Sequence, residues 1–204
     1  MAGIIGKKVG MTQVFTEDGT AVPVTVIEAG PCPVTAVRDP ERDGYAAVQL
    51  AHGETDEGRL TKAELGHLKK AGAAPMRTLV EFRGESEHRI GDVITVEAFE
   101  PGQKVKVSGT SVGKGFQGTI HRHNFSRGPV THGSHNVRAP GSVGASADPA
   151  RVFKGTRMPG RMGGGRVTQR RCEVVEVDTD RNLLLVKGAV PGPRNATVEV
   201  RSDG

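Results

Sequence analysis

One basic, glycine-rich stretch, residues 104–171, most constrains what this chain can fold into. It holds 13 lysine and arginine residues, a single acid at Asp148 and 13 of the chain's 29 glycines. After Ile120 it has few apolar residues at helical or strand spacing. Because its charges repel one another and its apolar surface is too small for a core, such a segment needs a polyanion to fold against. The rest of the chain is expected to hold this stretch in place.

The net charge of +5 conceals how unevenly the charges are distributed. Residues 1–103 contain 11 cations and 16 acids, and residues 172–204 contain four cations and six acids. Acidic flanks around one basic segment indicate a directed contact with nucleic acid. A membrane is not an expected partner. Membrane-surface segments interleave cations with large apolar residues on a helical face, and no apolar run reaches the roughly 18 residues of a membrane span.

The flanks alternate apolar and polar residues in short runs, which predicts β-strands. The expected strands cover residues 9–15, 21–29, 34–38, 45–51, 77–83, 93–99, 103–109, 172–177, 183–186 and 197–201. The first two should form a hairpin, with Pro23 at an edge or a bulge. One helix is expected over residues 60–71, capped by Thr61 and Glu64. This pattern predicts a mainly β fold, a small closed barrel or sandwich with one short helical region.

The two flanks are expected to form a single discontinuous domain. Three C-terminal strands alone would make a poor core. We therefore expect residues 1–106 and 172–204 to fold together, with residues 107–171 inserted as a long irregular extension. Cys32 and Cys172 have no neighbouring cysteine or histidine ligand. Their spacing is typical of two reduced, partly buried thiols in a cytoplasmic protein.

Residues 113–118 match the pattern G-x-G-x-x-G that some dinucleotide-binding proteins carry. That function requires a preceding strand, a following helix and an acid about 20 residues on. Only the strand is expected here, and the first acid after the motif is Asp148. No Gly-Lys-Ser/Thr of a nucleotide triphosphate loop occurs either. We expect no cofactor and no small-molecule substrate. The glycines would instead let a phosphate chain approach, with Lys114 paired to it.

Four histidines, at positions 121, 123, 132 and 135, have spacings that could suggest a metal site. Metal-binding histidines usually need a carboxylate or carbonyl to orient them, and the local sequence has no acid. We expect no metal. Imidazoles among arginines suit stacking on bases and hydrogen bonding to phosphate or 2′-OH groups. Because no Gly-x-Ser-x-Gly element is present either, we expect no catalytic residues and no enzyme activity.

Residues 151–166 space their cations by about three to five positions and interleave them with Phe153, Met158 and Met162. A disordered basic linker seldom holds such a mixture. The pattern favours a segment that becomes ordered against RNA, with cations on phosphates and with glycine and proline letting the backbone thread between helices.

Four blocks together resemble the bacterial ribosomal protein L3 family of the large subunit. They read IGKKVGMTQVF at 5–15, GTSVGKGFQGT at 109–119, PGSVG at 140–144, and RVFKG followed by MPGRMG at 151–163. The resemblance implies a translation-protein-type β-barrel and an arm that reaches through 23S rRNA toward the peptidyl transferase centre. It also implies early rRNA binding and a role in starting subunit assembly. The expected partners are 23S rRNA and neighbouring large-subunit proteins in cytoplasmic ribosomes, with no homo-oligomer.

The expected rRNA contacts combine the cations of this stretch with nearby rings and amides. They are Lys7, Lys8, Lys114, Phe116, His121, Arg122, His123, Asn124, Arg127, His132, His135, Arg138, Arg151, Phe153, Lys154, Arg157, Arg161, Arg166 and Arg170. The arm tip, near residues 143–149, would place Gly144, Ala145, Ser146, Ala147 and Asp148 close to the peptidyl transferase centre.

Some family members carry a methylated glutamine at the tip. Because no glutamine occurs in this region of the chain, we expect no such modification. The residues alone leave open two other functions. One is an enzyme with a nucleotide cofactor at residues 113–118, and the other is a DNA-condensing protein outside the ribosome.

Overall fold

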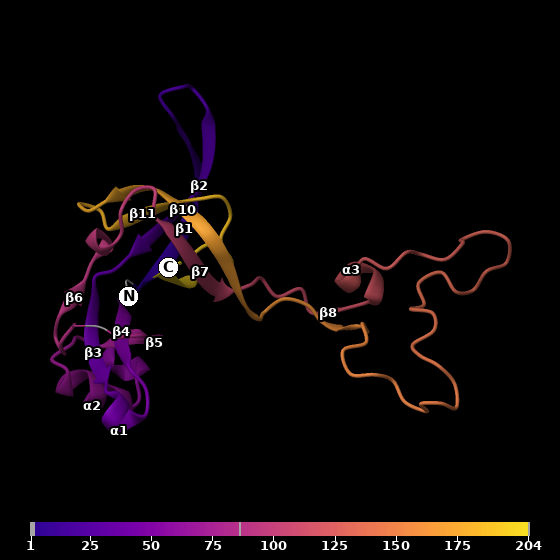
Figure 1. Cartoon of the computed structure of the whole chain (residues 1–204), viewed down its shortest axis with the longest axis horizontal. Coiled ribbons are helices and arrows are strands. Elements are labelled where there is room, and N and C mark those ends of the chain that lie inside the picture. The colour runs from indigo at the N-terminus through magenta and orange to yellow at the C-terminus, as the bar shows by residue number, and fades with distance from the viewer. Residues whose placement is uncertain (1–2, 86, 204) are drawn as a thin grey trace. The chain divides into compact units, whose positions relative to one another are not determined.

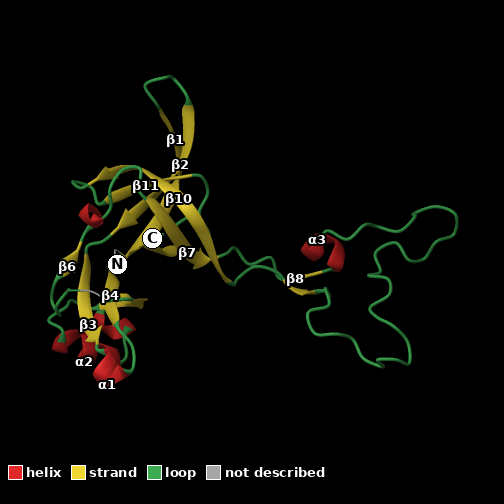
Figure 2. Ribbon diagram, viewed as in Figure 1, coloured by secondary structure: helices red, strands yellow, loops and turns green. Residues whose placement is uncertain are grey.

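The computed structural model describes residues 3–85 and 87–203. The chain divides into two compact units. We call residues Met1–Ser111 with Arg166–Gly204 the barrel unit, and residues Val112–Gly165 the inserted unit. Figures 1 and 2 show the elements in chain order and by type.

Six antiparallel strands close into a barrel within the barrel unit. Their order is β1-β12-β7-β10-β11-β2. The strands are β1 (Gly3–Phe15), β2 (Ala21–Ala29), β7 (Lys104–Thr110), β10 (Arg166–Asp178), β11 (Leu183–Lys187) and β12 (Thr197–Ser202). The mainly β fold with a closed barrel is therefore confirmed, and so is the hairpin of β1 and β2.

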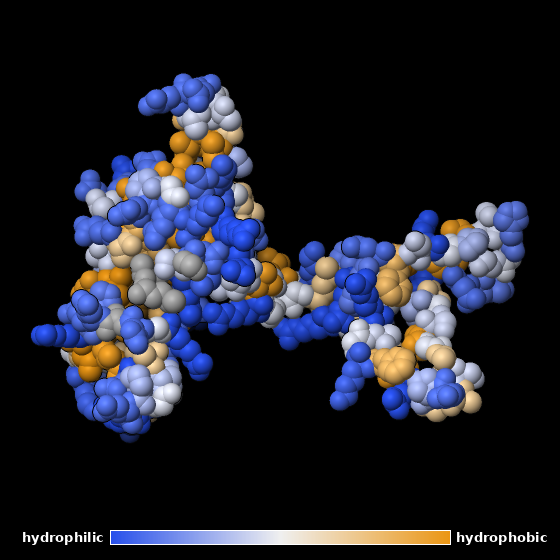
Figure 3. Space-filling model, in the orientation of Figure 1, coloured by the Kyte–Doolittle hydropathy of each residue, from blue (hydrophilic) through white to orange (hydrophobic). Residues whose placement is uncertain are grey.

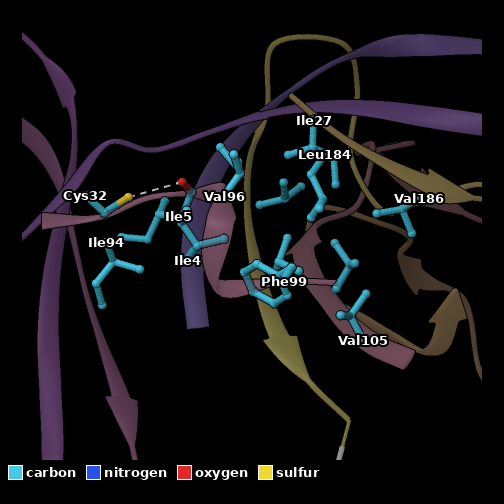
Figure 4. Close-up of a cluster of buried hydrophobic side chains, with 14 of the residues drawn as sticks. Ile4, Ile5, Ile27, Cys32, Ile94, Val96, Phe99, Val105, Leu184 and Val186 are labelled. Atoms are coloured by element: carbon cyan, nitrogen blue, oxygen red, sulfur yellow. Dashed lines mark hydrogen bonds between the residues drawn. The ribbon is translucent and has the colours of Figure 1, made fainter. Parts of the chain in front are cut away.

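Alternating side chains of these strands fill the barrel interior. Val105 and Val107 of β7 and Val198 and Val200 of β12 are all 0% exposed, because every second residue of a strand faces inward. They join isoleucines and leucines of the neighbouring strands in one apolar core, part of which is drawn in Figure 4. The period-two pattern that predicted these strands is thus the pattern that builds the core.

A second sheet packs onto the same core. Its order is β5 (Met76–Arg83), β4 (Ala47–Glu54), β3 (Cys32–Arg38) and β6 (Val93–Ile94). Cys32, Val34, Leu50 and Phe82 of this sheet belong to the same buried cluster as the barrel residues. The helix α2 (Lys62–Lys70) covers a smaller apolar cluster around Leu68.

Arg201 joins the barrel to the second sheet. Its Nη2 donates hydrogen bonds to the Glu81 carbonyl oxygen (3.2 Å) and to Glu199 (3.3 Å). Its guanidinium carbon lies 4.6 Å from the ring centroid of Phe82. The buried Nε is a polar atom without a hydrogen-bond partner within the described residues. The aromatic face therefore offsets part of the cost of burying this cation.

The expected capped helix is present, and a second, shorter helix was not expected. The capping box of α2 is present, with Thr61 and Glu64 bonded reciprocally. A four-residue helix, α1 (Pro40–Asp43), occupies a segment expected to be a loop, because the Asp39 side chain caps it and Gly44 ends it in the left-handed conformation. No helix within 3–85 or 87–203 has both the length and the apolar character to cross a membrane.

Three expected strand boundaries were wrong by five residues or more. The strand β1 begins at Gly3, six residues before the expected start at residue 9, because residues 3–6 are all buried and show no alternation. The strand expected over residues 93–99 ends at Ile94, and a 3-10 turn follows at Val96–Ala98. Val96 and Phe99 are both buried and lie three residues apart, which is the spacing of a 3-10 turn. In addition, β10 begins at Arg166, six residues before the expected start. Residues 166–171 are all exposed, so they carry no apolar alternation that would reveal a strand.

The ladder between β7 and β10 forms the two ends of the inserted unit. Thr110 lies opposite Arg166, so the chain leaves and re-enters the barrel at one pair of residues. A bulge in β10 places Arg171 at φ 55. The Arg171 N–H donates to Asp203 (3.1 Å), whose side chain is only 6% exposed. This carboxylate stabilises the bulge near the point where the insertion begins.

We expect the barrel unit to fold without the insertion. Replacing residues 112–165 with a four-residue Gly/Ser linker would leave the barrel ladder and its core intact, because residues 110 and 166 already face each other. The truncated chain should unfold in one cooperative transition in urea and retain its β-type circular dichroism. A non-cooperative or absent transition would contradict this independence.

We also expect a loss of stability at alkaline pH that comes from Cys32. Its Sγ donates to the Ile5 carbonyl (3.3 Å), and burial raises the pKa of the thiol to about 11. The unfolded thiol ionises near pH 9 while the folded thiol stays protonated, so its contribution is full below pH 9 and is lost as the pH rises toward 11. In this window the free energy of unfolding should fall by up to about 1.4 kcal/mol per pH unit.

Cys32→Ala tests this expectation against the parent chain. Urea unfolding from pH 7 to 10.5 should give curves of stability against pH that run parallel below pH 9 and approach each other above it, because the parent falls more steeply. Parallel curves would show that the thiol does not contribute.

Candidate nucleic-acid interface

The inserted unit contains a short paired stem. The strands β8 (Phe116–Gln117) and β9 (Gly160–Arg161) are antiparallel. Beside them the Lys114 N–H donates to the Met162 carbonyl (2.9 Å), and the Met162 N–H donates to the Gly115 carbonyl (2.9 Å). The helix α3 (Thr119–His123) follows β8 directly. Most other residues of the unit form turns and loops (Figure 2).

One backbone carbonyl joins α3 to the opposite side of the stem. The Met158 oxygen accepts from Arg122 Nη1 (2.7 Å) and from His123 Nε2 (3.0 Å). Because a carbonyl only accepts, His123 must carry a hydrogen on Nε2. We call these two bonds the Met158 clamp. Gly160 makes room for it, since a Cβ there would lie 2.7 Å from Arg122 Nη1.

Other glycines allow equally close backbone approaches within the unit. A Cβ on Gly163, whose φ is +69, would collide with the Val112 carbonyl oxygen. A Cβ on Gly128 would collide with the Asn136 carbonyl, and the Gly128 N–H closes that loop by donating to Val137 (3.0 Å). Glycine is therefore required at these positions by the chain's own packing.

The cations of the inserted unit have no acidic partners. The unit holds eight lysine and arginine residues against the single acid Asp148. Seven of the eight are exposed, and Arg122 is half-buried. Across residues 3–85 and 87–203, none of the eight takes part in a salt bridge. Uncompensated positive charge on an irregular backbone attracts a polyanion.

Exposed aromatic rings lie among these cations. Phe116 is 77% exposed and Phe153 is 58% exposed. The guanidinium carbon of Arg151 lies 5.8 Å from the Phe153 ring centroid. The rings of His123 and Phe125 lie 6.1 Å apart in a tilted arrangement. Exposed rings beside cations provide stacking surfaces for bases.

The remaining predicted contacts of the unit lie on exposed loops. Asn124 ends α3 in the left-handed conformation, and His132 also has a positive φ. The exposed loop positions are Asn124, Arg127, His132, His135, Arg138, Lys154 and Arg157. The predicted tip residues Gly144, Ala145, Ser146, Ala147 and Asp148 are exposed as well.

Four predicted contacts belong to the barrel unit, and three of them already have partners. Lys8 Nζ donates to the carbonyls of Val190 (2.9 Å) and Gly192 (2.8 Å). Arg166 pairs with Glu199, and Arg170 with Asp203 (3.5 Å). Lys7 is exposed. Sequence reasoning treated all four cations alike, because the two acids, Glu199 in β12 and Asp203 directly after it, approach only through the barrel register.

The alternative of a nucleotide cofactor at residues 113–118 gains no structural counterpart among the described residues. After the G-x-G-x-x-G motif, α3 is only five residues long, which is shorter than the helix of a dinucleotide-binding unit. Cβ atoms at Gly113 and Gly118 would meet open space. In the part of the chain that the structure describes, no three histidine, cysteine or acidic side chains group together as a metal site.

A closed barrel that carries a long, glycine-rich cationic insertion is the class of protein that this fold defines. The family model described as ribosomal protein L3 matches residues 78–182. The chain belongs to the ribosomal protein L3 family, whose members are structural components rather than enzymes. The resemblance of the four sequence blocks is thereby confirmed.

Relatives match over nearly the whole chain. Large ribosomal subunit protein uL3 of Thermosynechococcus vestitus is 54% identical over 97% of this chain and 94% of the relative. The protein of the same name from Acaryochloris marina is 52% identical over 98% and 95%. That of Pelobacter propionicus is 54% identical over 98% and 97%.

We expect the Met158 clamp to order the stem before any ligand binds. Arg122→Gln removes a hydrogen bond worth about 1 kcal/mol, so amide hydrogen exchange at residues 114–117 and 160–162 should rise about fivefold in the free protein. The matched control is Arg157→Gln, which removes the same charge from an exposed side chain. Equal exchange in the two variants would contradict the clamp.

Proposed function

We propose that this chain is a structural constituent of the large subunit of cytoplasmic ribosomes and binds 23S rRNA directly through its inserted unit. The names of its relatives support the first part. One observation carries the second. Seven of the eight cations of the inserted unit are exposed, and none of the eight pairs with an acid among the described residues, whereas three of the four predicted contacts in the barrel unit, Lys8, Arg166 and Arg170, already have internal partners. RNA phosphates would supply the missing anions.

Different side chains would serve different parts of the RNA. Exposed cations would neutralise phosphates and fix the register, while rings and imidazoles would stack on bases or bond to sugars. The proposed phosphate contacts are Lys114, Arg127, Arg138, Arg151, Lys154, Arg157 and Arg161. The proposed base or sugar contacts are Phe116, His121, His132, His135 and Phe153.

The division into units supports a role in early assembly. The barrel unit has its own complete core, so it would dock as a preformed body while the loops of the inserted unit, Val112–Gly165, become ordered on the RNA. The tip near residues 143–149 would extend toward the peptidyl transferase centre. Its small exposed residues, Ala145 to Ala147, would be placed there by the cationic segments on either side. Neighbouring large-subunit proteins would contact the outer surface.

We expect the salt dependence of rRNA binding to report the inserted unit. The quadruple variant Arg151→Gln, Lys154→Gln, Arg157→Gln and Arg161→Gln removes four proposed phosphate contacts. The slope of log Kd against log salt for a 23S rRNA fragment should become shallower by about 3, because each contact releases most of one counterion. Filter binding or fluorescence anisotropy from 50 to 300 mM KCl measures this slope.

The control removes the same charge from the barrel unit. Arg59→Gln, Lys62→Gln, Arg77→Gln and Arg89→Gln neutralise four exposed cations outside the proposed interface. This variant should keep most of the slope. If both variants lost the same slope, binding would depend on net charge alone and the assigned interface would be wrong.

A further inference from the structure

The β1–β2 hairpin continues beyond the barrel as a free two-stranded ribbon. In the barrel, β12 pairs with β1 only as far as Lys7, and β11 pairs with β2 only from Val24 onward. Residues 13–15 of β1 and 21–23 of β2 pair only with each other, whereas residues 10–12 of β1 lie opposite the part of β2 that also pairs with β11. We call residues 10–23 the ribbon. Figure 1 shows it projecting from the barrel of its own unit.

The ribbon exposes large apolar side chains. Met11 is 51% exposed and Phe15 is 63% exposed, and Val9 at the base is 41% exposed. Met11 and Phe15 are four residues apart on one strand, so they share a face of the ribbon. Figure 3 shows hydrophobic residues along the ribbon below a hydrophilic end. A grouped apolar surface of this kind marks an interaction site more often than a free surface.

The outer edge of β1 is an unprotected strand edge. From Gly10 to Phe15 the strand has β2 on one side and, among the described residues, no strand on the other. Alternate residues there direct N–H and C=O groups outward. Natural edges are usually blunted by proline, lysine or a bulge. The segment Gly-Met-Thr-Gln-Val-Phe has no proline and no lysine, and the bulge lies before Gly10.

A groove lies at the inner end of this edge. It has a volume of about 450 Å³ and is lined by the backbone and side chains of residues 9–12 together with Val26, Arg194 and Asn195. The groove begins where β12 stops pairing with β1. An added strand would therefore continue the position of β12 along the ribbon.

The charge of the ribbon opposes RNA and favours a basic protein segment. No lysine or arginine occurs from Val9 to Val37, although the chain as a whole is basic. The exposed turn carries Glu17 and Asp18 instead. Phosphate contacts depend on cations, so this surface would repel the rRNA backbone. Arg194 supplies one cation at the opposite, inner end of the groove.

We propose that the ribbon docks an extended segment of a second large-subunit protein by strand addition along Gly10–Phe15. The segment places apolar side chains on Met11 and Phe15 and a lysine or arginine beside Glu17 and Asp18. Main-chain hydrogen bonds supply affinity, and the alternating side chains and the charge at the turn supply direction. The proposal rests on the proposed function, because the partner is met only in the assembled subunit.

Photo-crosslinking in whole large subunits tests the proposal. A benzophenone amino acid replaces Phe15, and separately the exposed Glu97 as a control, in cells that then yield purified subunits. Irradiation should join position 15 to one protein, through a peptide that contains lysine or arginine, while position 97 should not join that peptide. Crosslinks from position 15 to rRNA, to this chain alone, or to nothing would overturn the proposal.

Two variants test the direction of docking. Met11→Ser with Phe15→Ser should reduce the amount of the partner retained in high-salt-washed subunits by at least about tenfold, as expected for a central apolar anchor. Glu17→Lys with Asp18→Lys should also reduce it, whereas Glu97→Lys with Glu100→Lys should not. Equal retention in all variants would overturn the proposal.

Failure of the proposed function can be distinguished from failure of the docking proposal. If the parent chain does not enter the large subunit, the ribosomal assignment is wrong. If the parent and both ribbon variants enter the subunit and only the partner is retained equally, the docking surface alone is wrong. Thermal unfolding of the purified variants confirms that exposed substitutions leave the barrel folded.

Discussion

The antiparallel ladder between β7 and β10 is the contact on which the rest of the molecule depends. Its inner residues, among them Val105, Val107 and Val174, belong to the barrel core. Its end, Thr110 opposite Arg166, fixes both ends of a segment that has almost no core of its own. The β7–β10 ladder already holds the two ends of the insertion side by side. Because the entropy cost of closing a loop grows only slowly with its length, the long insertion adds little to the cost of forming this ladder. A cationic insertion with almost no core of its own therefore costs the barrel little stability when it begins and ends at this ladder.

The region around this ladder also separates two groups of cations: those that pair with acids of the barrel unit and those that have no acid nearby. Near the ladder, Asp203 accepts from the Arg171 N–H and pairs with Arg170, and Glu199 pairs with Arg166 and Arg201. These cations stabilise the barrel and its bulge. Within residues 112–165 the sequence contains no acid except Asp148. A cation that already holds a carboxylate gains less from a phosphate, so the division of acids along the chain sets where a polyanion can be bound most strongly.

The sequence predicted those features that local patterns encode. Period-two alternation of valines identified β7 and β12, and the Thr61–Glu64 spacing identified the capped helix. The first six residues of β10, 166–171, escaped prediction because they are exposed, and they form a strand only by pairing with β7. The Met158 clamp escaped for another reason. Its acceptor is a backbone carbonyl 36 residues from Arg122. Because every residue has such a carbonyl, the sequence does not show which one is the partner.

Glycines in the family blocks fall into two groups that residue identity alone does not separate. Gly163 is needed by the protein itself, because a Cβ would strike the Val112 carbonyl, whereas a Cβ on Gly160 would meet the movable end of the Arg122 side chain. Gly113 and Gly118 face open space, so nothing in the chain's own packing excludes a side chain there. A residue that costs backbone entropy without relieving a clash is expected to serve something outside the chain. Under the proposed function, the open glycines are where the RNA backbone would approach the stem, next to Lys114 and the exposed ring of Phe116.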